Sequence, residues 1–213
     1  MKIDFVSDVV CPWCAIGLAS LQAALARVPE AGPVTVHCQP FELNPQMGPE
    51  GEDIVAHLSA KYGISAEQIV QNRQAIQARG EALGFRFGAR DRTYNTFDAH
   101  RLLHWAGLQG AQLALKRALL QAYHGDGENV SDHAVLARLA EQAGLDGTQA
   151  GEILASGAYA AEVREREHFY QAQGIRSVPA VILNDRYLIS GGQPPEVFEQ
   201  ALRQVMQETA APR

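Results

Sequence analysis

The chain has 213 residues, of which 46% are hydrophobic and 20% are charged, as is usual for a globular protein. A chain of this length can bury a sizeable core without the help of disulfide bonds. Its formal net charge of −6 argues against a nucleic-acid partner, because binding to phosphates requires an excess of Lys and Arg.

The N-terminal region contains an uncharged stretch over residues 9–26 that could be mistaken for a secretory signal. A signal peptide begins with positive charge, whereas here Asp4 and Asp8 outnumber Lys2. Cleavage after Ala26 would also discard two clustered cysteines. We therefore expect residues 9–26 to belong to the mature protein, which we expect to be cytoplasmic and to have no membrane partner.

The first part of the chain predicts a β-α-β unit. Residues 2–7 (KIDFVS) are β-prone, and their apolar and polar side chains alternate, as in a short strand. A helix is predicted to follow, with Pro12 in its first position, where a missing N–H costs nothing, and with its end at Pro29. Residues 34–39 alternate again and predict a second strand.

Between about 42 and 174 the sequence predicts helices and no strand. Residues 65–68 (SAEQ) form a capping box, which predicts a helix that extends to Gly84. Asn95 and Ser131 are the predicted caps of two later helices. Further helices are predicted over about 110–123, 148–156 and 159–173.

The last part of the chain returns to β structure. Residues 180–183 and 187–189 flank the tripeptide Asn184-Asp185-Arg186, which predicts a hairpin. A final helix is predicted from apolar residues at helical spacing, namely Phe198, Leu202 and Val205. The predicted order is therefore β-α-β, a set of helices, and then β-β-α.

Cys11 and Cys14 form a C-x-x-C motif at the predicted turn from strand to helix. A thiolate is the nucleophile in disulfide exchange, and a helix N-terminus stabilises it through unpaired N–H groups and the positive end of the dipole. Cys11 is therefore the predicted attacking thiol, and Cys14 lies within reach to resolve a mixed disulfide. Three cysteines are too few for a disulfide scaffold.

The segment 8–14 (DVVCPWC) resembles the active site of the DsbA-like thioredoxin family, and most closely that of its FrnE branch of dithiol–disulfide isomerases. Three other segments are also similar, namely 40–45 (PFELNP), 95–101 (NTFDAHR) and 174–180 (GIRSVPA). The resemblance implies an α/β thioredoxin fold formed by residues 1–41 and 175–213. A large all-helical insertion over residues 42–174 would interrupt this fold.

The resemblance also implies a cis peptide bond between Val178 and Pro179, beside the two cysteines. The main chain at Val178 could then pair with an extended substrate, and Pro12 and Trp13 of the motif would complete the substrate-binding surface. The redox group would be a disulfide between the motif cysteines, and we expect no metal or other cofactor. Because Trp13 replaces the histidine of DsbA and offers no cation, we expect a less oxidising site.

Several other residues allow two interpretations. Asp8 is a candidate proton relay for the resolving cysteine, but a turn residue is equally compatible with its position. Cys38 alternates with valines and is the predicted core thiol; a zinc site that also used His37 would need two side chains on opposite faces of a strand. His100 and His104 share one helix face, yet no third metal ligand is evident, so a packed helix is favoured.

Two classes of function remain. The favoured class is an enzyme that exchanges disulfides with protein substrates or with small thiols such as glutathione, as a monomer or homodimer. In a reducing cytoplasm it would isomerise or reduce rather than oxidise. The alternative is a glutathione-dependent isomerase or transferase, since the 2-hydroxychromene-2-carboxylate isomerases and kappa-class glutathione transferases resemble this chain in architecture. Those enzymes need no redox pair, so the C-x-x-C motif favours the first class.

Overall fold

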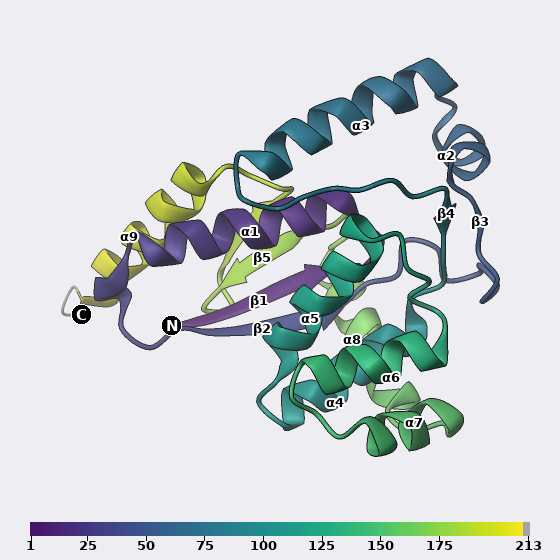
Figure 1. The fold of residues 1–213 in the computed structure, drawn as a ribbon. Helices are drawn as coiled ribbons and strands as arrows, with labels where there is room; N and C mark the ends of the chain where they lie inside the picture. The colour runs from purple at the N-terminus through teal and green to yellow at the C-terminus, as the bar shows by residue number, and fades with distance from the viewer. Residues whose placement is uncertain (211–213) are drawn as a thin grey trace.

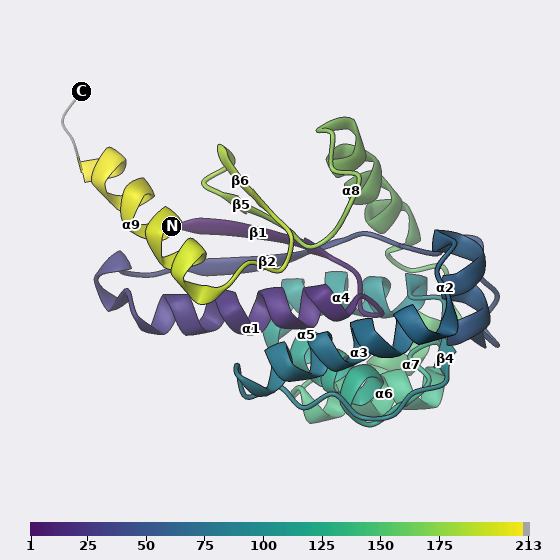
Figure 2. The ribbon, with the colours of Figure 1, turned by 90° about the horizontal axis from the view of Figure 1, so that it is seen from above.

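A four-stranded sheet lies at the centre of the structure, a computed structural model that describes residues 1–210. The strand order is β2-β1-β5-β6; β1 pairs parallel with β2 and antiparallel with β5 (Figure 1, and Figure 2 for β6). The strands are β1 (Lys2–Ser7), β2 (Thr35–Pro40), β5 (Ala180–Leu183) and β6 (Tyr187–Ser190). The predicted β-α-β and β-β-α parts are confirmed, and they join through β1.

Helices cover both faces of this sheet. Phe5 and Val181 belong to a buried cluster with residues of α1 (Pro12–Ala26) and α9 (Pro195–Ala210). Val6 points to the opposite face, because side chains alternate along a strand, and packs in a cluster with Tyr170 of α8 (Ala160–Ala172). Figure 2 shows α1 and α8 on opposite sides of the strands. The sheet is therefore buried between the helix that begins at the cysteines and a helix from the middle of the chain.

The chain between β2 and β5 is mainly helical. Its helices are α2 (Ile54–Tyr62), α3 (Ala66–Glu81), α4 (Phe97–Leu108), α5 (Gln112–Leu120), α6 (His133–Gln142), α7 (Gly147–Ala155) and α8, with a π-helical turn η2 (Gln121–Gly125) after α5. Helix α2 was not predicted, and the two-residue strands β3 (Glu52–Asp53) and β4 (Arg92–Thr93) add a short antiparallel ladder where only helices were expected. Within residues 1–210, no helix has the length and apolar character needed to cross a membrane.

The predicted capping box at the start of α3 is confirmed. The Gln68 N–H donates to Ser65 Oγ at 3.3 Å, and the Ser65 N–H donates to Gln68 Oε1 at 2.9 Å. The helix ends at Glu81, three residues before the predicted end at Gly84, which follows in a left-handed conformation.

Two other predicted caps are displaced by one residue. The cap of α4 is Thr96, while Asn95 Oδ1 accepts the N–H of Phe97 at 2.9 Å. The cap of α6 is Asp132, whose carboxylate accepts two N–H groups of the first turn; the Ser131 hydroxyl instead donates to the Asn95 carbonyl at 2.6 Å. Ser131 and Asp132 are both residue types that cap helices, but the Ser131 hydroxyl is engaged with Asn95, so Asp132 is the cap.

The inserted helices have a core of their own that reaches the cysteine-bearing turn. Buried residues of α4, α5, α6 and α7 form one hydrophobic cluster, which also contains Val9 and Val10 from the turn after β1. This turn is therefore fixed from one side by the sheet and from the other by the inserted helices.

Candidate active site

The turn between β1 and α1 places Cys11 at the start of the helix. Cys11 is the N-cap residue with φ −85° and ψ 114°, and Pro12 follows in the first helical position, as predicted. The N–H groups of Cys14 and Ala15 donate to the Cys11 carbonyl at 3.1 and 3.4 Å. The Cys11 side chain itself accepts no capping hydrogen bond. Its sulfur therefore experiences the helix dipole, without a direct hydrogen bond from the first turn.

The two motif cysteines are a close pair with unequal environments. Both are free thiols, their side chains approach to 3.3 Å, and Cys11 is 4% exposed whereas Cys14 is completely buried. Burial, followed by the hydrogen bond and charge of Cys11, raises the pKa of Cys14 well above its ordinary value. Cys11 is therefore the thiol that borders the cavity, and Cys14 lies behind it.

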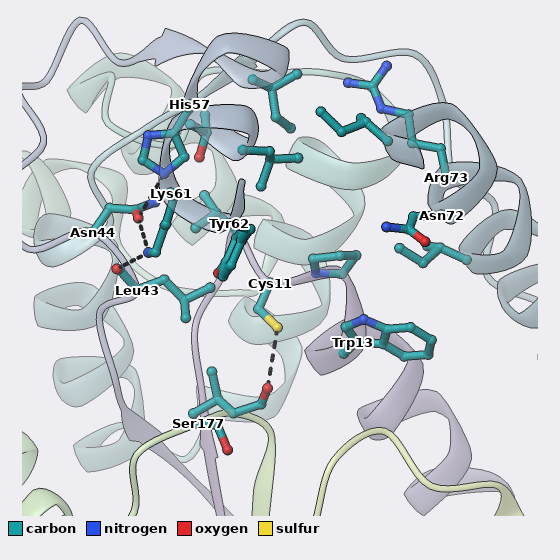
Figure 3. A pocket seen from close by; sticks show the side chains of 18 of the residues that line it. Cys11, Trp13, Leu43, Asn44, His57, Lys61, Tyr62, Asn72, Arg73 and Ser177 are labelled. Atoms are coloured by element: carbon teal, nitrogen blue, oxygen red, sulfur yellow. Dashed lines mark hydrogen bonds between the residues drawn. The ribbon is translucent and has the colours of Figure 1, made fainter. Parts of the chain in front are cut away.

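The Val178–Pro179 peptide bond is cis, and its loop lies against Cys11, as predicted. The Cys11 thiol donates to the Val178 carbonyl with a sulfur–oxygen distance of 3.7 Å (Figure 3). The Pro179 ring packs on Gly17 of α1, where an added Cβ would lie 3.0 Å from the Pro179 Cγ. The absence of a side chain at position 17 thus allows the loop to approach the helix.

A cavity of about 840 Å³ opens beside Cys11. The N-terminus of α1, the segment after β2, helices α2 and α3 and the loop before Pro179 all contribute to its walls (Figure 3). Its lining is largely apolar, with Ile54, Leu58, Ile69 and Ile76 among the lining residues. The charged side chains that line it are the cations Lys61, Arg73, Arg90 and Arg176 and one carboxylate, Glu42. This surplus of positive charge favours a ligand that is apolar in part and carries negative charge.

Trp13 lies at the edge of this cavity. Its side chain is 37% exposed, and the Arg79 guanidinium of α3 lies over its ring at 5.2 Å. This contact joins the first turn of α1 to α3. Arg79 therefore places positive charge on the indole that stands between the two cysteines in sequence.

Helix α2 contributes polar groups that the sequence analysis missed, because that helix was not predicted. The Lys61 ammonium donates to the Leu43 carbonyl and to Asn44 Oδ1, both at 2.6 Å. His57 lies between Glu52 and Asn44 at 2.6 and 3.0 Å. The spacing of His57 and Lys61, four residues apart on one helix face, is the signal that could have indicated a polar wall.

Asp8, the candidate proton relay, is completely buried behind the motif. One carboxylate oxygen accepts the Leu43 N–H at 2.7 Å, and the other lies 3.4 Å from His100 Nε2. Burial alone would raise the pKa of Asp8, but His100, the Leu43 N–H and Thr96 together lower it below the ordinary value. It is the main chain of Asp8 that lowers the pKa of Cys14. A relay role for the carboxylate stays a prediction.

The remaining predicted positions, Cys38, His100 and His104, are not among the residues that line the cavity. Cys38 is buried on β2, where burial raises its pKa to about 11, and the Gln112 side chain pairs with its main-chain N–H and carbonyl at 2.8 and 3.0 Å. His100 Nε2 donates to the Phe41 carbonyl at 3.2 Å, and His104 packs against Tyr159 with ring centroids 5.2 Å apart. Across residues 1–210, no group of three or more His, Cys, Asp and Glu side chains is arranged to hold a metal ion.

A sheet of order β2-β1-β5-β6, with a C-x-x-C motif at the start of its first helix and a cis-proline loop opposite, defines a thioredoxin-fold protein with a helical insertion. The sequence comparison then gives the family. The chain belongs to the DsbA family, since the family model described as a DSBA-like thioredoxin domain matches residues 2–203. The narrower FrnE assignment stays a prediction.

Solved structures agree with this family. The probable DsbA oxidoreductase SCO1869 from Streptomyces coelicolor is 38% identical, with a TM-score of 0.93 over 100% of this chain and 93% of that chain. A 2-hydroxychromene-2-carboxylate isomerase is 17% identical, with a TM-score of 0.73 over 99% and 98% of the two chains. The cytosolic disulfide reductase DsbM from Pseudomonas aeruginosa, solved with GSH, is 16% identical, with a TM-score of 0.67 over 97% and 100%. The last two similarities concern the fold alone.

Proposed function

We propose that this protein is a thiol–disulfide oxidoreductase in which Cys11 attacks a substrate disulfide and Cys14 resolves the mixed disulfide. The observation that carries the proposal is the close pair of free thiols, one at the cavity and one buried behind it. The Cys11 thiolate would displace one substrate thiolate and form a mixed disulfide. Cys14 would then lose its proton and attack the Cys11 sulfur, so that the second substrate thiolate leaves and takes up a proton. The substrate is reduced, and the Cys11–Cys14 disulfide carries the oxidising equivalents.

The cavity supports a small, negatively charged thiol or its disulfide as one substrate or redox partner. Glutathione fits this description, since it has two carboxylates and little bulk. The apolar walls and cationic side chains beside Cys11 would hold such a molecule. The carbonyl of Val178, 3.7 Å from the Cys11 sulfur, is also placed where the extended main chain of a peptide could pair. Reduction or isomerisation of protein disulfides in the cytoplasm therefore belongs to the same proposal.

The second candidate function is a glutathione-dependent isomerase or transferase. The cationic cavity favours it, because such an enzyme needs a bound thiol and no redox pair in the protein. The close approach of Cys14 to Cys11 favours the oxidoreductase, because an isomerase would have no use for a second thiol.

The test is to trap the intermediate. Reduced Cys14→Ala should accumulate one glutathione on Cys11 after incubation with oxidised glutathione, as measured by intact-protein mass spectrometry. The wild type should proceed to the Cys11–Cys14 disulfide, and Cys38→Ala should behave as the wild type because Cys38 is buried and does not line the cavity. A Cys11→Ala, Cys14→Ala variant that still isomerises 2-hydroxychromene-2-carboxylate with glutathione would establish the second candidate instead.

A further inference from the structure

Lys116 of α5 is a fully buried lysine whose ammonium has no hydrogen-bond partner among the residues that the structure describes. Removing a charged group from water without pairing it is strongly unfavourable, so such a lysine is rare unless something compensates for it. The mechanism described so far does not use this side chain. Its position therefore requires an explanation.

The helix geometry directs Lys116 toward the cysteine-bearing helix. Leu113, Lys116 and Leu120 share one face of α5, since they are spaced by three and four residues. Leu113 and Leu120 pack in the same hydrophobic cluster as Ala15 and Leu18 of α1. Lys116 lies between these two leucines on the same face of α5, so its buried side chain is directed into this cluster, which contains residues of α1.

Three titratable groups from three elements lie within the electrostatic reach of Lys116. They are Cys14 of α1, Cys38 of β2 and His124 of η2. Burial is the largest influence on each; it raises the pKa of both thiols and lowers that of the imidazole, whereas the charge of Lys116 lowers all three. His124 is engaged elsewhere, because its Nε2 contacts the Val9 carbonyl at 2.9 Å.

We propose that Lys116 supplies the buried positive charge that stabilises the Cys14 thiolate during resolution of the mixed disulfide. The inference rests on the proposed function. Resolution breaks the bond between Cys11 and the substrate sulfur, forms the Cys11–Cys14 bond and releases the substrate thiolate, which takes up the proton that Cys14 gave up. Lys116 acts through Cys14, so it is a positioning residue.

The order of the steps explains why this charge matters in the second one. In the free enzyme, Cys11 makes ionisation of Cys14 harder through its hydrogen bond and its charge. Once Cys11 is bonded to a substrate sulfur, it no longer carries that charge. Burial then remains as the obstacle to the Cys14 thiolate, and Lys116 and the main chain of Asp8 are the groups that oppose it.

The experiment separates the two steps in a Cys38→Ser background, so that the third thiol does not react. Reduced protein is mixed with the chromogenic disulfide of thionitrobenzoate, and each release of coloured thiolate is timed. The first release reports attack by Cys11, and the second reports closure by Cys14. Lys116→Met keeps an unbranched side chain one atom shorter than that of lysine and removes its charge.

We expect Lys116→Met to leave the first release within about twofold of the parent and to slow the second about tenfold at about pH 7. The difference should shrink as the pH rises, because Cys14 then ionises without help. Arg117→Met is the matched control, since it removes the same charge from the exposed side of the same helix. It should change neither phase.

A second variant, Lys116→Gln, covers the event that Lys116→Met does not fold, as judged by circular dichroism. If closure in the folded variants keeps the rate and pH profile of the parent, the proposal is overturned. A slowing that is equal at every pH would show a packing role and would also overturn it. If the parent itself shows no first release, the proposed function fails together with the inference. If the parent releases both thiolates normally, the proposed function stands, and an unchanged closure rate in the variants overturns the role of Lys116 alone.

Discussion

At the scale of single residues, the three cysteines of this protein have the same side chain in three different environments. Cys11 borders the cavity, Cys14 is buried against it, and Cys38 is buried on β2 beside the Gln112 side chain. Burial disfavours a thiolate, since the charge loses its hydration. The three thiols therefore differ in how readily they ionise and react, because one borders the cavity and two are buried in the protein interior.

The first prediction concerns the order in which these thiols react. Near neutral pH, iodoacetamide should label Cys11 alone, because the pKa of Cys14 is raised well above its ordinary value and that of Cys38 is raised to about 11. The measurement is labelling of the reduced protein against pH, with each site followed by mass spectrometry. In Cys11→Ser, Cys14 should label at lower pH than in the wild type, because one cause of its raised pKa is removed. Preferential labelling of Cys38 would contradict this order.

The second prediction concerns Asp8 and the pH dependence of stability. Its pKa is lower in the folded state than in the unfolded chain, so its ionised form stabilises the fold. That stabilisation is complete above the unfolded pKa of about 3.9 and is lost as the pH falls through the lower folded value. Asp8→Asn should therefore reduce the free energy of unfolding by about 1–3 kcal/mol at about pH 7, and by less at about pH 3.

Urea unfolding of both proteins across this pH range measures the difference directly. Glu165→Gln, at an exposed position on α8, is the control, and its free energy of unfolding should change with pH as that of the wild type does. A gap between Asp8→Asn and the wild type that stays constant down to low pH would show that the carboxylate charge is not what stabilises the fold.

At the scale of elements, α3 forms one wall of the cavity with little packing of its own. Ile69 and Gly80 are the buried residues of this helix, and most of its other side chains are exposed. A helix with so few buried contacts depends on local interactions for its stability. The capping box at Ser65 and Gln68 is therefore important for keeping this wall of the cavity in place.

The third prediction follows from that dependence. Ser65→Ala should remove about 1 kcal/mol from the local stability of α3 and raise hydrogen exchange of its first-turn amides about fivefold. Native-state exchange measured by mass spectrometry or NMR resolves this helix from α1. Ser131→Ala is the matched control: exchange at the start of α6 should not change, because Asp132 is the cap there. Faster exchange in α6 would show that the cap was assigned to the wrong residue.

At the scale of the whole molecule, the helical insertion and the thioredoxin part share buried surface. Val9 and Val10 pack into the core of the inserted helices, and Tyr170 of α8 packs against the sheet at Val6. Arg164 of the same helix pairs with Glu42, just after β2. We propose that residues 42–174 and the rest of the chain unfold as one cooperative unit, because Val9 and Val10 are buried in the core of the insertion and Tyr170 is buried against the sheet.

The fourth prediction tests this cooperativity with the two tryptophans. Trp13 lies in α1 of the thioredoxin part, and Trp105 lies buried in α4 of the insertion. Trp105→Phe leaves the first reporter, and Trp13→Phe leaves the second. In each variant, urea unfolding followed by fluorescence should coincide with unfolding followed by far-ultraviolet circular dichroism. Two separate midpoints within one variant would show that the parts unfold independently.

The sequence alone determined the features that depend on neighbours along the chain. The alternation in residues 2–7, Pro12 at the helix start and the capping box at residues 65–68 each involve groups only a few residues apart, so their spacing is sufficient to predict them. The cis bond before Pro179 also agreed with the structure, although it rested on resemblance to a family. The predicted cap at Ser131 was wrong by one residue, because the next residue, Asp132, is an equally good helix cap.

Contacts between side chains that are distant in sequence could be recognised in the folded structure alone. The cations of the cavity come from separate elements, and α2 escaped prediction because Ile54 is its one buried residue, so it has no apolar stripe to detect. Lys116 is the clearest case. A lysine in a helical sequence is ordinarily exposed, even where it shares a helix face with leucines, as Lys116 does with Leu113 and Leu120. It is buried because α5 packs against α1 and β2 over that face, and packing between distant segments is set by the folded chain as a whole.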